Sequence, residues 1–210
     1  MQATSARALK EQRRHARRRR TGSERLAFLR GFLRHPVMVG SVIPSSRRLI
    51  DRMLGPVDWE STRLFVEYGP GVGTFTRVIL DRLPEDARLV TIDTNPEFTA
   101  FLKESIDDPR LIAVTASAAD VEKVLSDRGL GHADYILSGL PFSTLPPGVG
   151  DAIGAATARA IRPGGAFLVY QFSPKVRDFI APVFERIERG FEWINVPPAT
   201  LFWAWREPRD

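Results

Sequence analysis

The sequence predicts an α/β fold in which helices cover both faces of a mostly parallel sheet. From residue 63 onward, short apolar segments alternate with helical ones, which is typical of parallel strands joined by helical crossovers. Uninterrupted apolar stretches such as 166–170 fit strands that are buried on both faces. A glycine-rich turn follows the first of these strands, where folds of this class bind nucleotides. We therefore expect an α/β domain preceded by a helical extension.

Composition excludes several kinds of protein. The 210 residues are 43% hydrophobic and 26% charged, as expected for one globular domain with a further segment. They contain no cysteine, which excludes disulfides, thiolate metal sites and cysteine nucleophiles. The three histidines, His15, His35 and His132, are too widely spaced to suggest a metal cluster. No apolar run approaches the roughly 20 residues of a membrane span, and no secretory signal pattern is present, so we expect a cytoplasmic protein without a metal.

The positive charge is concentrated at the start of the chain. Residues 1–54 carry fourteen Lys/Arg and three Asp/Glu, whereas residues 55–210 carry sixteen and twenty-two. This asymmetry predicts a basic arm over 1–54 and an acidic body over 55–210, with a polyanionic partner for the arm.

Two amphipathic helices are expected within the basic arm. After an arginine-rich stretch at 13–20, a helix begins near 24 and ends at Pro36. Its apolar residues recur at helical spacing: Leu26, Leu29 and Leu33, with Phe28 and Phe32 beside them. A second helix is expected at about 46–54, closed by Gly55-Pro56.

The body alternates strands and helices until its last two strands. Strands are predicted near 63–68, 88–93, 110–115, 133–138 and 165–172, and helices near 74–83, 96–105, 119–128, 149–161 and 175–188. Residues 191–195 and 201–205 are rich in strand formers, and the five residues between them are too few for a helical crossover. These two segments are therefore expected to form an antiparallel hairpin at the edge of the sheet.

The turn after the first strand carries the main candidate ligand residues. Glu67 precedes Gly69, Gly71 and Gly73, which allow a tight turn and close approach of a ligand to the backbone. The following helix offers free N–H groups. Asp93 ends the next strand, where a carboxylate accepts hydrogen bonds from ribose hydroxyls. The alternative is a glycine turn without a ligand, with Asp93 as a helix cap.

The glycine spacing resembles motif I of the S-adenosylmethionine-dependent methyltransferases with a Rossmann-like fold, since Thr74 stands where a dinucleotide-binding turn has its last glycine. The resemblance implies a seven-stranded sheet in the order 3-2-1-4-5-7-6 with an antiparallel last strand. It also implies S-adenosylmethionine as cofactor and S-adenosylhomocysteine as product. Asp93 and Thr94 would then lie at the ribose, and Ser117 and Ala118 at the adenine. The family often has Asp at the place of Ser117, so backbone amides would have to serve there.

The segment after the fourth predicted strand is similar to a motif of amino-methylating enzymes. Ser138-Gly139-Leu140-Pro141-Phe142 resembles N-P-P-Y or N-L-P-Y, but Gly139 stands at the place of Asn. Enzymes acting on planar nitrogens use that Asn, whereas a deprotonated aliphatic amine is a good nucleophile without it. Carbonyl groups near Ser138 and Leu140 are candidates for aligning the amine. The alternative is that Pro141 and Phe142 only stiffen a loop.

Several separated motifs together resemble the bacterial phospholipid N-methyltransferases that associate with membranes. The motifs are Gly40-Ser41-Val42-Ile43-Pro44-Ser45-Ser46, Glu67-Tyr68-Gly69-Pro70-Gly71-Val72-Gly73, Ser138-Gly139-Leu140-Pro141-Phe142, Tyr170-Gln171-Phe172-Ser173-Pro174 and Asn195-Val196-Pro197-Pro198-Ala199. This resemblance implies methylation of phosphatidylethanolamine toward phosphatidylcholine. It places Gly40 and Ser41 in a lid over the cofactor. Tyr68 and Tyr170 are candidates for contacts with the cofactor and the headgroup, or else are core aromatics.

A lipid substrate gives the basic arm a function. The arginines and the apolar face of the arm suit binding to the surface of an anionic membrane. The candidate membrane-binding residues are Arg17, Arg18, Arg19, Arg20, Leu26, Phe28, Leu29, Phe32 and Leu33. We therefore expect a peripheral protein on the inner face of the cell membrane, without a stable nucleic-acid partner. The alternative is that the apolar helix packs on the sheet as part of the core.

Three other functions are weighed against lipid methylation. An RNA adenine N6-dimethyltransferase would share the basic surface and the glycine spacing, but Gly139 lacks its Asn and no helical domain follows the last strand. A non-catalytic binder of membrane or nucleic acid on a methyltransferase scaffold would be expected to have lost Glu67, the glycines or Asp93. A dehydrogenase is disfavoured by the glycine spacing and the terminal hairpin.

Overall fold

The computed structural model describes residues 46–171, 175–195 and 198–207. Contacts within the chain divide it between Val42 and Ile43, so all described residues belong to the second unit. The helices are α2 (Arg47–Leu54), α3 (Thr74–Arg82), α4 (Pro96–Ser105), α5 (Val121–Ser126), α6 (Val149–Ala160) and α7 (Val176–Ile180), with 3-10 turns η2 (Ala118–Asp120) and η3 (Phe142–Thr144). The strands are β1 (Leu64–Tyr68), β2 (Arg88–Asp93), β3 (Leu111–Thr115), β4 (Ala133–Ser138), β5 (Ile161–Gln171), β6 (Arg186–Glu192) and β7 (Ala199–Trp205).

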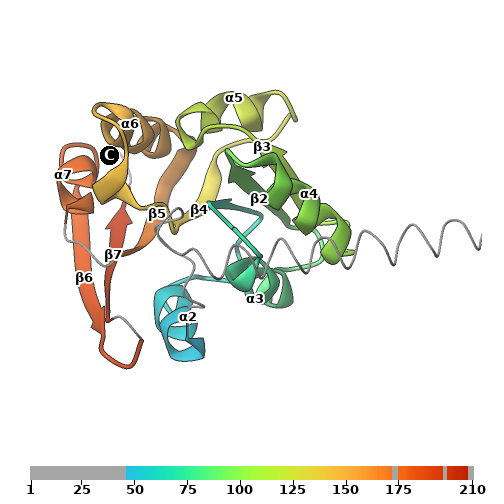
Figure 1. Ribbon diagram of the computed structural model, residues 1–210, viewed down its shortest axis with the longest axis horizontal. Coiled ribbons are helices and arrows are strands. Elements are labelled where there is room, and N and C mark those ends of the chain that lie inside the picture. The colour runs from blue at the N-terminus through green and yellow to red at the C-terminus, as the bar shows by residue number, and fades with distance from the viewer. Residues whose placement is uncertain (1–45, 172–174, 196–197, 208–210) are drawn as a thin grey trace, which may run out of the picture. The chain divides into compact units, whose positions relative to one another are not determined.

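Within the described residues, the seven strands form one sheet in the order β3-β2-β1-β4-β5-β7-β6. The first five are parallel, whereas β7 is antiparallel to both β5 and β6 (Figure 1). The predicted fold class, strand order and terminal hairpin are therefore confirmed. Strand order reverses between β1 and β4, and in open sheets of this kind the ligand binds at the carboxyl ends of the strands at that point.

The core consists of two apolar layers, one on each face of the sheet. Buried residues of α2 and α3, such as Leu49 and Phe75, pack on one face. Residues of α5, α6 and α7, such as Val121 and Ile153, pack on the other. Strand side chains alternate between the layers, so that Phe65 faces α3 and Val66 faces α6.

Helix α2 forms where the sequence predicts a helix at 46–54. The Ser46 hydroxyl accepts a hydrogen bond from the Leu49 amide (3.2 Å), which caps the helix. On the inner side of α2, the Met53 carbonyl accepts a hydrogen bond from the buried Trp203 indole of β7 (2.9 Å). Helix α2 thus packs within the unit that contains the sheet, although a boundary after residue 54 is predicted from the charge pattern.

The predicted helix at 175–188 is wrong in its second half. Helix α7 ends at Ile180, and residues from Arg186 onward form the edge strand β6. Charged residues such as Glu188 and Arg189 fit an exposed edge strand, since such charges discourage pairing with other chains. Pairing with β7 outweighs their local helix preference.

Candidate active site

The candidate site lies at the carboxyl ends of β1, β2 and β4. Tyr68, the last residue of β1, is paired with Ser138 of β4 on one side and with Ile92 of β2 on the other. The segments that follow these strands therefore begin at the same edge of the sheet. Two backbone hydrogen bonds join them, from the Gly139 amide to the Tyr68 carbonyl (3.2 Å) and from the Gly69 amide to the Ile92 carbonyl (2.9 Å).

The glycine turn has the backbone that its sequence predicts. Gly69, Gly71 and Gly73 all have positive φ, at 63°, 53° and 81°. A β-carbon on Gly73 would lie 2.6 Å from Leu102 Cδ2, so this glycine also allows α3 to approach α4 closely. A β-carbon on Gly71 would meet nothing within 4 Å. Open space therefore lies beside the middle of the turn, where a ligand can approach the backbone.

Asp93 ends β2 and faces the glycine turn. Its carboxylate accepts a hydrogen bond from the Asn95 amide (2.8 Å), and the Gly71 amide also favours its charged form. Burial nevertheless raises the pKa of Asp93. Asn95, rather than Asp93, caps α4, because its side chain accepts the Glu97 amide (2.8 Å). The alternative in which Asp93 is the helix cap is therefore wrong. Thr94 lies exposed in the bend after Asp93.

Glu67 is a buried acid under the glycine turn. Its carboxylate accepts a hydrogen bond from the Thr76 hydroxyl of α3 (2.6 Å). Burial, with a smaller contribution from the charge of Asp93, raises the pKa of Glu67 to about 7. Among the described residues, no arginine or lysine contributes to its titration. The side chain is therefore placed to become a carboxylate when a cationic group comes near.

The segment after β3 is held next to Asp93. The Ala116 amide donates to the Asp93 carbonyl (3.0 Å). Ser117 caps η2, because its hydroxyl accepts the Ala119 amide (3.2 Å), and Ala118 is buried. The Ser117 side chain thus orders the turn, which leaves backbone groups of this segment as the candidate ligand contacts.

Residues 138–140 form a braced turn at the end of β4. Ser138 is buried, and its hydroxyl accepts the Leu140 amide (3.2 Å). The Leu140 carbonyl accepts a hydrogen bond from the Gln171 side-chain amide at the end of β5. Sequence reasoning missed Gln171 as an individual residue, although it lies within a motif that carries the family resemblance. The turn is thus fixed by contacts with two strands.

Tyr170 fills the space beside Gly139. Its ring stacks on Phe75 of α3, with centroids 4.9 Å apart. A β-carbon on Gly139 would collide with the Tyr170 hydroxyl oxygen and would lie 2.8 Å from Cζ of the ring. The phenol group therefore occupies the place where the side chain of the motif's Asn would begin, and the glycine at 139 and the tyrosine at 170 are structurally coupled.

Tyr68 lies on the opposite face of β1 from Glu67. Its side chain is fully buried, and its hydroxyl forms a hydrogen bond with Thr157 of α6 (3.2 Å). In this conformation Tyr68 belongs to the core and offers no exposed surface to a ligand. Gly40, Ser41 and the candidate membrane-binding residues between Arg17 and Leu33 lie outside the described residues.

Comparisons with known proteins identify the family. Residues 65–165 match the family described as "Methyltransferase domain". The chain is 30% identical over 179 residues to the ornithine lipid N-methyltransferase of Singulisphaera acidiphila, an alignment that covers 84% of this chain and 93% of that protein. The chain belongs to the S-adenosylmethionine-dependent methyltransferases.

Solved structures share the fold of the methyltransferase at low sequence identity. The N-methyltransferase NodS of Bradyrhizobium japonicum in complex with S-adenosylhomocysteine has a TM-score of 0.61 at 13% identity, over 77% of this chain and 85% of that one. The precorrin-6y C5,15-methyltransferase of Geobacter metallireducens has a TM-score of 0.60 at 14% identity, over 76% and 89%. These similarities confirm the Rossmann-like methyltransferase fold.

Shorter matches link part of the methyltransferase to a ribosomal RNA enzyme. The ribosomal RNA small subunit methyltransferase H of Leptothrix cholodnii is 39% identical over 77 residues, which are 35% of this chain and 24% of that protein.

The site residues fit S-adenosylmethionine chemically. The open space at Gly71 admits a flat ligand against the backbone. The Asp93 carboxylate suits ribose hydroxyls, and the buried Glu67 carboxyl suits a ligand that carries positive charge. S-adenosylmethionine has both, a ribose and cationic sulfonium and ammonium groups.

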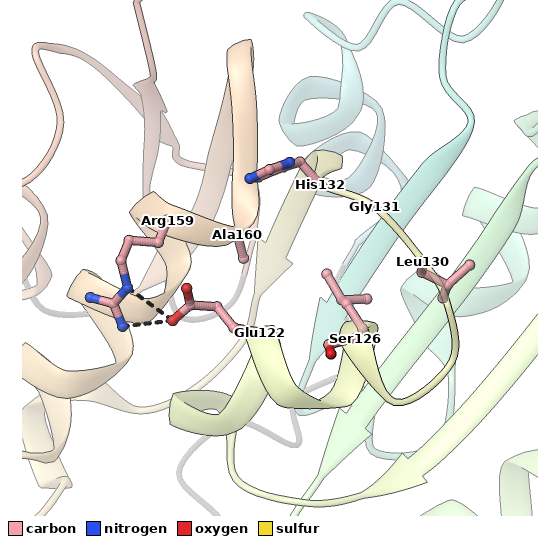
Figure 2. Close-up of a pocket in the computed structure, with 8 residues that line it drawn as sticks. Glu122, Ser126, Leu130, Gly131, His132, Arg159 and Ala160 are labelled. Carbon is pink, nitrogen blue, oxygen red and sulfur yellow. Dashed lines mark hydrogen bonds and ion pairs between the residues drawn. The ribbon is translucent and has the colours of Figure 1, made fainter.

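A separate hollow of about 180 Å³ lies near the amino end of β4, between α5 and α6. Figure 2 shows Arg159 of α6 reaching Glu122 of α5 at this hollow, with ion-pair atoms 2.6 Å apart. His132 also lines it. The hollow contains none of the predicted site residues.

Among the described residues, no helix is long and apolar enough to cross a bilayer.

Proposed function

We propose that this methyltransferase transfers the methyl group of S-adenosylmethionine to the aliphatic primary amine of a membrane lipid headgroup. The observation that carries the proposal is its similarity, over most of both chains, to an ornithine lipid N-methyltransferase. Ornithine and phosphatidylethanolamine headgroups both present an unhindered primary amine. The relative favours the ornithine lipid, and the motif resemblance favours phosphatidylethanolamine. In either case we propose a peripheral enzyme that acts at the inner face of the cell membrane.

The turn at 138–140 positions the amine. Bound S-adenosylmethionine supplies an electrophilic methyl group on its sulfonium. After the lipid ammonium releases its proton to water, its nitrogen would take the methyl group in line with the carbon–sulfur bond, which breaks and leaves S-adenosylhomocysteine. Because the turn is fixed by the Ser138 hydroxyl, the Gln171 amide and the Tyr68 carbonyl, it offers a preorganised edge against which the headgroup can be oriented.

Tyr170 takes the role for which other amino-methylating enzymes use Asn. Its hydroxyl lies beside Gly139, and its ring is held by Phe75. A phenol oxygen accepts a hydrogen bond from an amine N–H and so orients the nitrogen lone pair. An aliphatic amine needs this orientation only, whereas a planar adenine nitrogen needs electronic activation as well. The pairing of Gly139 with Tyr170 therefore favours an aliphatic amine over a nucleobase.

Purified protein with methyl-labelled S-adenosylmethionine tests the proposal. One set of vesicles contains ornithine lipid in phosphatidylglycerol, a second contains phosphatidylethanolamine in phosphatidylglycerol, and a third contains phosphatidylglycerol alone. Ribosomal RNA is the fourth acceptor. We expect label on the amine of one or both aminolipids and none in the third set, with mass spectrometry counting the methyl groups. Label in RNA alone, or in no acceptor while the protein binds S-adenosylmethionine, contradicts the proposal.

A further inference from the structure

The loop between β6 and β7 exposes two large apolar side chains. Trp193 is 75% exposed and Ile194 is 61% exposed, and they are the exposed large apolar residues of the described part of the chain. Adjacent exposed residues of this size are costly in water, and they mark interaction surfaces more often than solitary ones do. Neither takes part in the chemistry proposed above.

This loop lies at the same edge of the sheet as the candidate active site. Strand β7 begins beside the end of β5, because Thr200 is paired with Gln171 in the antiparallel ladder. Strand β5 is parallel to β4 and β1, so its end marks the edge to which the glycine turn and Gly139 also belong. Figure 1 shows the β6–β7 loop and α2 at the same end of the structure.

Hydrogen bonds hold the loop in place on α2. The Asn195 side-chain oxygen accepts the Ser46 amide (3.0 Å), and Arg52 donates to the Phe191 carbonyl (2.8 Å). Within the loop, the buried Glu192 carboxylate accepts the Ile194 amide (3.1 Å). The Trp193 ring lies against Phe191, with centroids 4.1 Å apart. The exposed pair is thus presented by a supported turn.

Basic residues of α2 lie beside the loop that carries the exposed pair. Arg48 and Arg52 of α2 each lie 3.6 Å from a carboxylate oxygen of Glu192, yet their side chains remain 66% and 47% exposed. Arg47 is also exposed. Two arginines therefore share one buried carboxylate, and α2 carries a third, exposed arginine, which leaves a net positive rim on α2 beside the aromatic–aliphatic tip.

We propose that Trp193 and Ile194 insert into the interface of an anionic lipid bilayer, with Arg47, Arg48 and Arg52 at the level of the phosphate groups. Tryptophan favours this interface because its ring is apolar and its N–H is polar, and arginine binds phosphate through several donors. Insertion turns the carboxyl edge of the sheet toward the headgroups. The inference rests on the proposed lipid substrate. Its arginines belong to α2, the last helix of the predicted arm, but it uses none of the residues between Arg17 and Leu33 that were predicted to bind the membrane.

Fluorescence of the full chain tests the insertion directly. The vesicles contain phosphatidylglycerol and phosphatidylcholine and no lipid with a primary amine, so binding is measured apart from methyl transfer. We expect tryptophan emission to shift to the blue and to be quenched by brominated acyl chains. In the Trp193→Phe protein, binding stays within about threefold while most of the quenching is lost. Replacing both apolar residues, Trp193→Ala with Ile194→Ser, weakens vesicle affinity roughly tenfold or more.

A matched pair of arginine variants tests the basic rim. Arg47→Ser and Arg88→Ser remove the same charge, but Arg88 lies at the amino end of β2, at the opposite edge of the sheet. We expect Arg47→Ser to weaken binding about fivefold, as for one charge near an anionic surface, and Arg88→Ser to leave it nearly unchanged. Equal effects of the two substitutions would contradict the assignment of the rim.

Two outcomes would overturn the inference. One is sedimentation of the protein with vesicles while the emission of Trp193, taken as the difference between the unsubstituted protein and the Trp193→Phe protein, is unchanged. The other is a blue shift without lipid that grows with protein concentration together with dimer formation, because a second copy of the chain would then cover the tip. Quenching by vesicles in a protein that methylates no lipid would leave the insertion standing and refute the proposed function. Lipid methylation without quenching would support the proposed function and refute the insertion.

Discussion

Replacing Glu67 by Gln changes how the stability of the protein depends on pH. Burial raises the pKa of Glu67 from 4.5 to about 7 in the folded protein. Between these values the side chain is ionised in the unfolded chain and protonated in the folded one, so the free energy of unfolding falls as pH rises. The raised pKa of Glu67 therefore destabilises the folded protein. This destabilisation is absent below about pH 4.5 and reaches its full size, roughly 3 kcal/mol, above about pH 7.

In the Glu67→Gln protein the side chain at position 67 is neutral at every pH. Its free energy of unfolding therefore lacks the fall with rising pH that Glu67 causes. Its side-chain oxygen still accepts the Thr76 hydroxyl, while its NH₂ group needs a partner. An unsatisfied NH₂ costs about 1–3 kcal/mol, but equally at every pH. The pH dependence of the difference between the two proteins is therefore the decisive quantity, rather than its absolute value.

Urea denaturation without ligand, between about pH 5 and pH 8, measures this quantity. We expect the stability of Glu67→Gln relative to the unsubstituted protein to rise by about 2–3 kcal/mol across the range. Glu188→Gln, at an exposed position on β6, controls for the removal of a carboxylate. A difference that stays flat between pH 5 and pH 8 would refute the argument that Glu67 is a buried, protonated acid.

The remaining predictions concern Gly139 and Asp93. Gly139→Ala drives a methyl group into the Tyr170 phenol, so we expect a loss of about 1–3 kcal/mol in unfolding free energy and a lower kcat. Most of that stability loss disappears in a Tyr170→Ala background, and a double-mutant cycle in urea with additive effects would contradict the coupling. Asp93→Ala removes the acceptor expected at the ribose, so cofactor affinity measured by calorimetry falls roughly a hundredfold. Asp81→Asn, at an exposed position on α3, is its control and leaves affinity unchanged.

Local sequence signals were sufficient to predict the nucleotide half of the site. Gly69, Gly71 and Gly73 have the positive φ that their spacing indicates. Asp93 is the last residue of β2, as the strand predicted at 88–93 places it. Each of these features depends on residues close together in the chain. The predicted strand order is also correct, because the family resemblance covers the whole sheet.

Features that depend on distant residues were harder to predict. The departure at Gly139 is visible in the sequence, but its explanation is a tyrosine on a different strand. Likewise, the segment beginning at Arg186 has the charges of an exposed helix, and only its pairing with β7 makes it a strand. Trp193 and Ile194 do not differ in sequence from core residues, and their exposure depends on where the β6–β7 loop ends.

The contact between Gly139 and Tyr170 has a consequence for comparing related sequences. A side chain larger than hydrogen at the first position and a phenol at the second cannot share the same volume. The two positions are thus expected to change together, with glycine accompanying tyrosine in one group and asparagine accompanying a smaller residue in another. The residue types at positions 139 and 170 would then divide these enzymes into two groups that differ in how they hold the nitrogen they methylate.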